Sequence, residues 1–257
     1  MKVLALMAHP DDIEFSCAGT LALLKQAGWE IHLATMTPGD VGSMSLAAEE
    51  ISRVRRAEAA ASAAILGAGY ACLESRDLAV FYEPDAKRRA TALIREIRPD
   101  LVITHAREDY MADHEETSKI AREAVFASSV PNWKTGRDPE PRPCDRIAEV
   151  LYADPLGGED WRGRRVKVRQ VVDITAVMDL KERMLAAHES QRSWLRAQHG
   201  VDEYIDSMKR WAERRAKDFG RKSVRWAEGF NRHLGHGFPG TDILTGALGG
   251  KLVKTLR

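Results

Sequence analysis

The sequence predicts an α/β fold, with a mainly parallel sheet flanked by helices and a helical C-terminal extension. Two observations lead to this fold class. Residues 3–7 and 101–104 are uniformly apolar runs of strand length, which is typical of strands buried on both faces of a parallel sheet. Short strands also alternate with helical segments along the first half of the chain, and this order favours right-handed crossovers between parallel strands. Hydrophobic residues make up 44% of the 257 residues, enough for the core of one large domain.

In the first half, glycine and proline mark the ends of most elements. Gly28 and Gly67 end two predicted helices, and the Arg98-Pro99 pair ends a third. The pattern predicts strands at residues 3–7, 31–36, 71–73 and 101–104, and helices at residues 19–26, 47–66, 85–97 and 115–125.

The second half begins with a proline-rich, charged surface segment at residues 131–143. Strands are expected at 148–152 and 169–172, and the second leads into a helix that runs to about residue 197. A further helix is expected at 201–222, with an apolar stripe formed by Tyr204, Ile205, Met208, Trp211 and Ala212. Its other face is basic, and we interpret it as solvated because acidic residues interrupt it. We expect a core at residues 1–200, with residues 201–257 forming a helical extension and tail packed on the same domain.

Composition excludes several classes of protein. The 39 basic and 38 acidic residues leave a net charge of +1, so no nucleic-acid partner is expected. No stretch approaches the roughly 18–20 apolar residues that cross a bilayer, so no membrane insertion is expected. The three cysteines are far apart and contain no C-x-x-C, which excludes a disulfide framework and a thiolate zinc cluster and favours a cytoplasmic location.

The most informative motif is His9-Pro10-Asp11-Asp12, placed where the first strand ends. His9 can supply a nitrogen and Asp12 an oxygen at the roughly 2.0–2.2 Å that zinc prefers, while Asp11 stays free to take a proton from water. Pro10 restricts the backbone and helps to turn the side chains the same way. Taken alone, the motif is equally well explained as a turn and helix N-cap.

A second cluster of histidine and aspartate occupies residues 105–114, after the strand at 101–104. Ligands of α/β sheets bind outside the carboxyl ends of the strands, so the fold would bring the two clusters together. His114 is then the natural third metal ligand. Without the first cluster, it would read as an ordinary residue at the start of a helix.

Several motifs together resemble the PIG-L or LmbE-like zinc-dependent N-deacetylases. They are His9-Pro10-Asp11-Asp12, Arg55-x-x-Glu58-Ala59 ahead of Leu66-Gly67, Asp113-His114, and Lys181 followed by His188-Glu189-Ser190-Gln191. The resemblance spans residues 1 to about 191 and implies a Rossmann-like fold. It also implies Zn²⁺, or another divalent metal, on His9, Asp12 and His114, with Asp11 as general base.

The same resemblance implies further roles and a substrate class. Arg55 would orient the substrate, and Asp113 would support the site. Apart from the resemblance, the position of His105 in the second cluster makes it a further candidate for substrate binding or for support of the site. An exposed helix position explains Arg55 equally well. The expected partner is a small N-acetylated molecule, such as an N-acetylglucosamine derivative, and the resemblance is compatible with a homo-oligomer.

Met111 departs from the family pattern. Family members usually carry a histidine three residues before the last zinc ligand, and a thioether can neither donate a proton nor carry charge. Nearby in sequence are His105, Asp109 and Tyr110. Farther along, residues 228–239 contain two histidines among glycines, a composition that favours a loop folded over a pocket. We expect His233 or His236 of this segment to replace the missing histidine, and prefer His236 because Gly235 and Gly237 would let the backbone approach the pocket. Exposure of both histidines at the surface is the competing interpretation. A route in which Asp11 also protonates the leaving amine would need no replacement.

Two other functions remain open. A metal-binding relative without catalysis would explain Met111, although a passive site has no use for Asp11. A nucleotide-binding protein is disfavoured because the turn after the first strand lacks G-x-G-x-x-G and carries acidic groups that repel a pyrophosphate.

Overall fold

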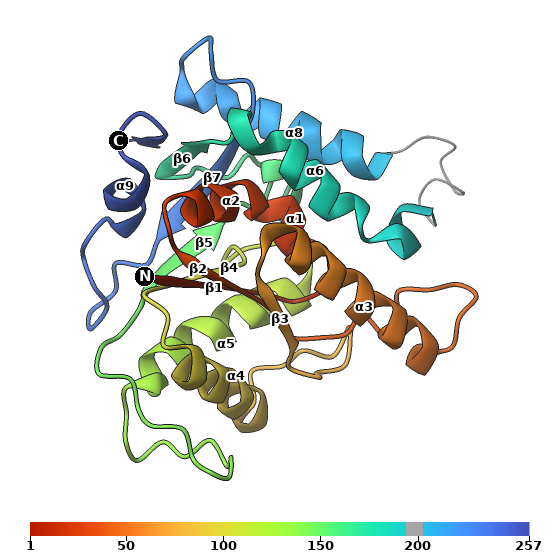
Figure 1. Ribbon diagram of the computed structural model, residues 1–257, viewed down its shortest axis with the longest axis vertical. Helices are drawn as coiled ribbons and strands as arrows, with labels where there is room; N and C mark the ends of the chain where they lie inside the picture. Colours follow the sequence, from red (N-terminus) through yellow and green to blue (C-terminus); the bar gives the residue numbers. More distant parts are fainter. Residues whose placement is uncertain (194–202, 257) are drawn as a thin grey trace.

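The computed structural model describes residues 1–193 and 203–256, which form one eight-stranded mixed sheet with helices on both faces (Figure 1). The strand order is β3-β2-β1-β4-β5-β7-β6-β8. Strands β1 to β5 pair in parallel, whereas β7, β6 and β8 pair antiparallel, so the predicted fold class is confirmed. The strands are Lys2–Met7 (β1), Glu30–Thr35 (β2), Gly69–Cys72 (β3), Leu101–Thr104 (β4), Glu149–Ala153 (β5), Gln170–Asp173 (β6), Ala227–Arg232 (β7) and Val253–Thr255 (β8).

Helices cover the sheet in two layers, visible above and below the strands in Figure 1. One layer consists of α4 (Pro84–Ile97) and α5 (Ala112–Ser128). The other contains α1 (Asp12–Ser16), α2 (Ala18–Gln26), α3 (Ala48–Leu66) and α6 (Met178–Ala186). Helix α8 (Glu203–Phe219) packs on β6 and β7, α9 (Ile243–Leu248) packs beside β8, and short 3-10 turns occupy Leu156–Gly158 and Thr175–Val177. Within these residues, no helix is long and apolar enough to span a membrane.

Strand β1 explains why a uniformly apolar run predicts a central strand. Val3, Ala5 and Met7 enter the core on one face of the sheet. Leu4 and Leu6 enter the core on the other face. Because successive side chains of a strand point to opposite faces, burial on both sides requires every position to be apolar.

The helix expected up to residue 197 is interrupted, which corrects the sequence interpretation. Helix α6 ends at Ala186, a turn at Ala187 and His188 interrupts the helical pattern, and a helix resumes at Glu189. The break places His188, which is fully buried, 3.4 Å from Glu14 Oε2. Residues 194–197 of the expected helix lie outside the described residues.

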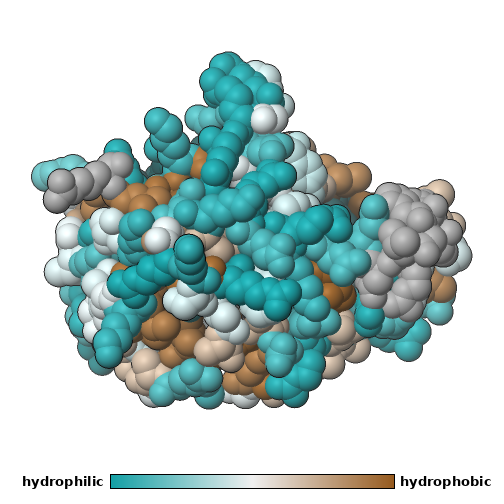
Figure 2. All heavy atoms as spheres, turned by 90° about the horizontal axis from the view of Figure 1, so that it is seen from above, coloured by the Kyte–Doolittle hydropathy of each residue, from teal (hydrophilic) through white to brown (hydrophobic). Residues whose placement is uncertain are grey.

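Helix α8 carries most of the amphipathic pattern expected for residues 201–222, of which 201 and 202 lie outside the described residues. Tyr204, Ile205, Met208 and Ala212 are buried as expected. The surface seen from above the view of Figure 1 is largely hydrophilic (Figure 2), and Arg210, Arg214 and Lys217 of α8 are exposed. Arg215 contradicts the solvated interpretation, because it is buried between Asp154 at 2.5 Å and Asp218 at 2.7 Å.

The segment around Glu228, expected to form a loop over a pocket, is instead strand β7 between β5 and β6. The buried Glu228 carboxylate explains this placement. It accepts hydrogen bonds from the backbone N–H groups of Gly19 at 2.9 Å and Thr20 at 2.7 Å, at the start of α2, and lies 2.6 Å from Lys181 Nζ. A helix N-terminus favours a negative charge, and the ammonium group compensates it in the core.

The Lys181–Glu228 ion pair predicts a large effect on stability. Lys181→Met leaves a buried carboxylate without its cation, so we expect the free energy of unfolding to fall by about 3–5 kcal/mol in chemical denaturation. Lys209→Met is the matched control, because Lys209 lies 2.6 Å from Glu182 with side chains about a third exposed. It should cost less than about 1 kcal/mol. Equal, small losses in both variants would contradict a stabilising role for the buried pair.

Candidate metal centre

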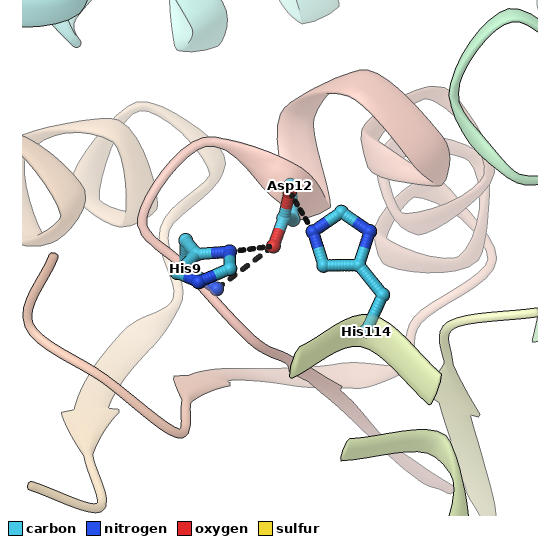
Figure 3. A group of neighbouring side chains, drawn as sticks. All are labelled: His9, Asp12 and His114. Carbon is cyan, nitrogen blue, oxygen red and sulfur yellow. Dashed lines mark hydrogen bonds and ion pairs between the residues drawn. The ribbon is translucent and has the colours of Figure 1, made fainter. Parts of the chain in front are cut away.

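The two histidine-rich loops meet at one edge of the sheet. Strands β1 and β4 pair in parallel, with Ala5 opposite Ile103, so the loops that follow them leave side by side. His9 lies in the loop after β1, Asp12 begins α1, and His114 lies in the first turn of α5. Figure 3 shows the Asp12 carboxylate between the two imidazoles. One ligand atom from each of the three lies within 4.8 Å of the others.

Asp12 is the centre of this group. Its Oδ2 accepts the His9 backbone N–H at 2.8 Å and lies 3.3 Å from His9 Nδ1, while Oδ1 lies 3.4 Å from His114 Nε2. His105 Nε2 approaches the same Oδ2 to 3.2 Å. Burial would raise the pKa of the Asp12 carboxyl, but His114, His105 and His9 outweigh it and hold the pKa well below its usual range. The lowered pKa favours the ionised form of Asp12, which is the form that can coordinate a metal ion.

In each of the two candidate histidine ligands, the ring nitrogen that points away from Asp12, here called the outer nitrogen, lies close to a further carboxylate. His9 Nε2 lies 3.0 Å from Asp77 Oδ1 and 3.1 Å from Asp113 Oδ2. His114 Nδ1 lies 3.0 Å from Asp109 Oδ1. Metal-binding histidines usually donate their second N–H to such a group, which fixes the ring. His9 Nδ1 and His114 Nε2 are left facing Asp12.

The residues fit a divalent metal. His114 Nε2 is buried and has no hydrogen-bond partner among the described residues, as expected of a nitrogen that awaits a ligand. Two other close sets, His105-Asp109-His114 and His9-Asp77-Asp113, use nitrogens that already face carboxylates. Two imidazoles and one carboxylate are a donor set typical of zinc.

Protons and a metal would compete at this site. Burial lowers the pKa of His9, but its contacts with Asp113, Asp12 and Asp77 outweigh burial and raise the pKa well above its ordinary value. Burial also lowers the pKa of His114, while Asp12 and Asp109 raise it above its ordinary value. The carboxylates thus favour a positive charge at this position, which a proton or a metal ion can supply.

Asp11 lies beside the ligands but points elsewhere. Its φ of 101° lies in the left-handed region that disfavours residues other than glycine, a conformation that costs on the order of 1–3 kcal/mol. The carboxylate Oδ2 accepts the Tyr204 hydroxyl at 2.6 Å and lies 3.4 Å from Arg55 Nη2. Burial raises the pKa of Asp11 against the opposing effects of Arg55 and Tyr204. Asp11 is therefore a stronger base than an exposed aspartate.

Arg55 is 4% exposed, so its interpretation as an exposed helix position is wrong. Its Nη2 donates to the Pro10 carbonyl at 2.7 Å, which ties α3 to the turn that carries Asp11. Gly39 packs against the guanidinium at a φ of +73°, and a Cβ there would come within 2.3 Å of Arg55 Nη1. Glycine is therefore required for this close approach.

A pocket of about 370 Å³ opens over the ligands. Asp11, Arg55 and the three candidate ligands line it together with Met111, which caps the start of α5. The remaining walls are largely apolar or aromatic, and they include Phe15, Val41, Leu78, Tyr110, Leu156, Tyr204 and Trp211. The size of the pocket suits a small molecule.

The other predicted site residues are divided between the centre and the surface. Asp113 supports His9, as described above. His105 is buried behind Asp12, where its Nε2 also accepts the Ala8 backbone N–H at 2.9 Å, so it supports the site and is not among the described residues that line the pocket.

The structure does not bring either tail histidine to the metal centre. His236 is exposed and is absent from the described lining of the pocket, so it does not lie where the expected acid would be needed. His233 Nδ1 lies 3.0 Å from the Tyr152 hydroxyl, in a different hollow. The physical reason is strand β7, which carries the chain that follows it away from the pocket.

Sequence reasoning missed two side chains that shape the centre. Asp77 follows β3, a third parallel strand, so its position after a strand was a usable signal. Tyr204 reaches Asp11 from a helix nearly two hundred residues away and had been assigned only to an apolar stripe. Its hydroxyl carried no local signal.

The chain is similar in sequence and in fold to several known proteins. Residues 4–125 match the family described as PIG-L: GlcNAc-PI de-N-acetylase. A 1D-myo-inositol 2-acetamido-2-deoxy-alpha-D-glucopyranoside deacetylase of Nakamurella multipartita is 30% identical, over 74% of this chain and 79% of that protein. The 4-oxalmesaconate hydratase of Pseudomonas putida is 26% identical, over 70% of each chain. The N,N'-diacetylchitobiose deacetylase structure from Pyrococcus horikoshii superimposes with a TM-score of 0.75 at 27% identity, covering 94% of this chain and 88% of that one.

We expect substitutions at the centre to weaken metal binding by different amounts, depending on whether they remove a ligand or a residue that supports one. His114→Ala removes a ligand and should weaken zinc binding by more than about 100-fold, because loss of a group that only supports a ligand typically costs 10- to 100-fold. Asp109→Asn, which alters only the support of His114, should fall in that lower range. Competition with a chromophoric chelator measures both. His236→Ala is the control and should bind zinc as the unmodified protein does; equal affinity in all variants would exclude this centre.

Proposed function

Because this chain belongs to the PIG-L family, we propose that it is a metal-dependent hydrolase that removes an acetyl group from the nitrogen of an N-acetylated amino sugar or a related small molecule. One observation carries the proposal. Asp11 lies at the pocket beside His9, Asp12 and His114, yet its carboxylate is held by Tyr204 and Arg55 instead of facing a ligand nitrogen. A site that only stored metal would not need a separate, oriented base.

His9, Asp12 and His114 would hold the metal. When bound, a divalent ion lowers the pKa of water and polarises a carbonyl oxygen. Asp11 removes a proton from the attacking water, and its raised pKa makes it a better acceptor. The water oxygen bonds to the acetyl carbon and the carbon–nitrogen bond breaks. The products are acetate and a free amine.

The departing amine needs a proton, and Met111 cannot give one. The proton that Asp11 has accepted is available at the same carboxylate. We therefore assign both transfers to Asp11, which replaces our expectation for His236. This single-residue route requires the Asp11 side chain to stay oriented through both steps.

Tyr204 and Arg55 supply that orientation. The Tyr204 hydroxyl donates to Asp11 Oδ2, and its ring makes an edge contact with Phe15 at 5.0 Å between centroids. Ile205 and Met208 anchor the same helix in the core. Tyr204 is therefore a positioning residue that couples the C-terminal extension to the proposed base.

Hydration of a carbon–carbon double bond is the second candidate. The similarity to a hydratase favours it, and so does Met111, because hydration releases no amine that must be protonated. A zinc-supplemented screen of N-acetylated sugars for acetate release tests the first candidate, and absorbance loss from unsaturated dicarboxylates tests the second. Metal binding without turnover in either assay would favour the non-catalytic relative.

Asp11 substitution tests the base. Asp11→Asn keeps the size of the side chain but removes its basicity, so we expect acetate release to fall by about 10²- to 10⁴-fold while the bound zinc is retained. Turnover and metal content are measured on the same preparation. His236→Ala serves as the control and should keep full turnover. An unchanged rate in Asp11→Asn would remove Asp11 from the mechanism.

Tyr204 substitution tests positioning. Tyr204→Phe removes one hydrogen bond to a charged group, so we expect kcat to fall roughly tenfold while KM changes little. Metal content should match the unmodified protein, because the ring and its contact with Phe15 remain. A change in KM alone would instead place Tyr204 in substrate binding.

A further inference from the structure

A second, larger hollow lies on the other side of the loop that follows β4. Its volume is about 900 Å³, and none of its described lining residues also lines the metal pocket. The walls come from residues 106–108 of that loop, from the ends of β5 and β7, and from residues 160–167. Basic side chains dominate the lining: Arg107, Arg164, Arg165, Lys167 and Arg232.

Two of these cations lack a carboxylate partner among the described residues. Arg107 and Lys167 are exposed, and neither forms an ion pair with any residue in the described part of the chain. Arg232 Nη2 donates to the carbonyls of Gly240, at 2.7 Å, and Thr241. Arg232 also helps to lower the pKa of the Asp242 carboxyl, so its charge is partly compensated from outside the hollow. Arg107 and Lys167 have no such compensation. The hollow therefore contains uncompensated positive charge.

The acidic residues in the lining do not cancel this charge. Asp160 accepts hydrogen bonds from the backbone N–H groups of Arg162 and Arg164 and lies 2.8 Å from Arg164 Nη2, so its carboxylate is already used. Arg165 lies 2.7 Å from Asp218, on α8. Glu108 is then the single acidic lining residue, among those described, that can oppose Arg107 and Lys167.

His233 reports the same positive environment. Burial lowers its pKa, and the nearby Arg122 and Arg107 lower it further, while Glu123 raises it. The His233 Nδ1 lies 3.0 Å from the Tyr152 hydroxyl. These groups add polar contacts at the edge of the cationic lining.

From this lining we infer that the hollow binds a small polyanion that carries two or more phosphate groups. Arginine guanidinium groups match phosphate oxygens in charge and in hydrogen-bond geometry. The cations come from three separate segments around a space large enough for a ligand of nucleotide size, since small-molecule sites typically measure about 300–1,000 Å³. A single anion would contact only some of them, whereas a polyphosphate can contact several.

Calorimetric titration of the full-length protein with pyrophosphate tests the inference. We expect saturable binding of one pyrophosphate per chain that weakens as salt increases. Arg107→Ala combined with Lys167→Ala should weaken binding at least about tenfold, because contacts with charged groups are lost. Arg53→Ala combined with Lys222→Ala removes the same charge from exposed positions outside the hollow and should bind within about twofold of the unmodified protein.

Further measurements decide among ligand classes. Citrate should bind more weakly than pyrophosphate, and a single-stranded oligonucleotide should not bind more tightly than pyrophosphate. Lys167→Gln, a single exposed change, checks the result if the double variant unfolds. No pyrophosphate binding, equal weakening in both double variants, or preference for citrate or the oligonucleotide would overturn the inference. None of these outcomes depends on the proposed deacetylase activity.

Discussion

The parallel pairing of β1 with β4 determines where the two histidine-rich loops begin. Both strands lie in the middle of the sheet, and Asp100 secures them at the end opposite the metal centre. Its Oδ2 accepts the Lys2 backbone N–H at 2.7 Å, and its own N–H donates to the Lys2 carbonyl at 2.9 Å. A slip of one residue would turn every side chain of a strand to the opposite face. His9 and His114 can meet only while this register holds.

At this edge of the sheet, the neighbouring carboxylates determine the orientation and the pKa values of His9 and His114. Asp77, Asp109 and Asp113 face the outer nitrogens of the rings, while Asp12 lies between the inner ones. Such a concentration of buried negative charge is costly unless cations are near. The same cost makes a positive charge favourable at the centre, which is why the pKa values of His9 and His114 are raised. A metal ion would supply that charge in place of protons.

The predictable parts of this structure are those whose signals are local. Uniform apolarity identified β1 and β4, and position at strand ends identified His9, Asp12 and His114 as neighbours. Strand β7 was not predicted, because its position depends on the contacts of Glu228 with Lys181 and with the start of α2. These contacts join segments that are far apart in the chain. Arg215 was misjudged for the same reason, since its partner Asp154 lies 61 positions earlier. Composition and spacing cannot report pairings of this kind.

The net charge of +1 conceals two opposed local fields. Acidic side chains surround the metal pocket. Arg55 is the one arginine among its described lining residues, and its guanidinium already contacts the Pro10 carbonyl and the Asp11 carboxylate. A highly anionic molecule would meet repulsion there until a metal was bound. On the far side of the same loop, Arg107 begins a cationic surface with few carboxylates. Because interactions between exposed charges are screened beyond about 10 Å at moderate salt, each hollow selects ligands by its own lining and not by the charge of the whole chain.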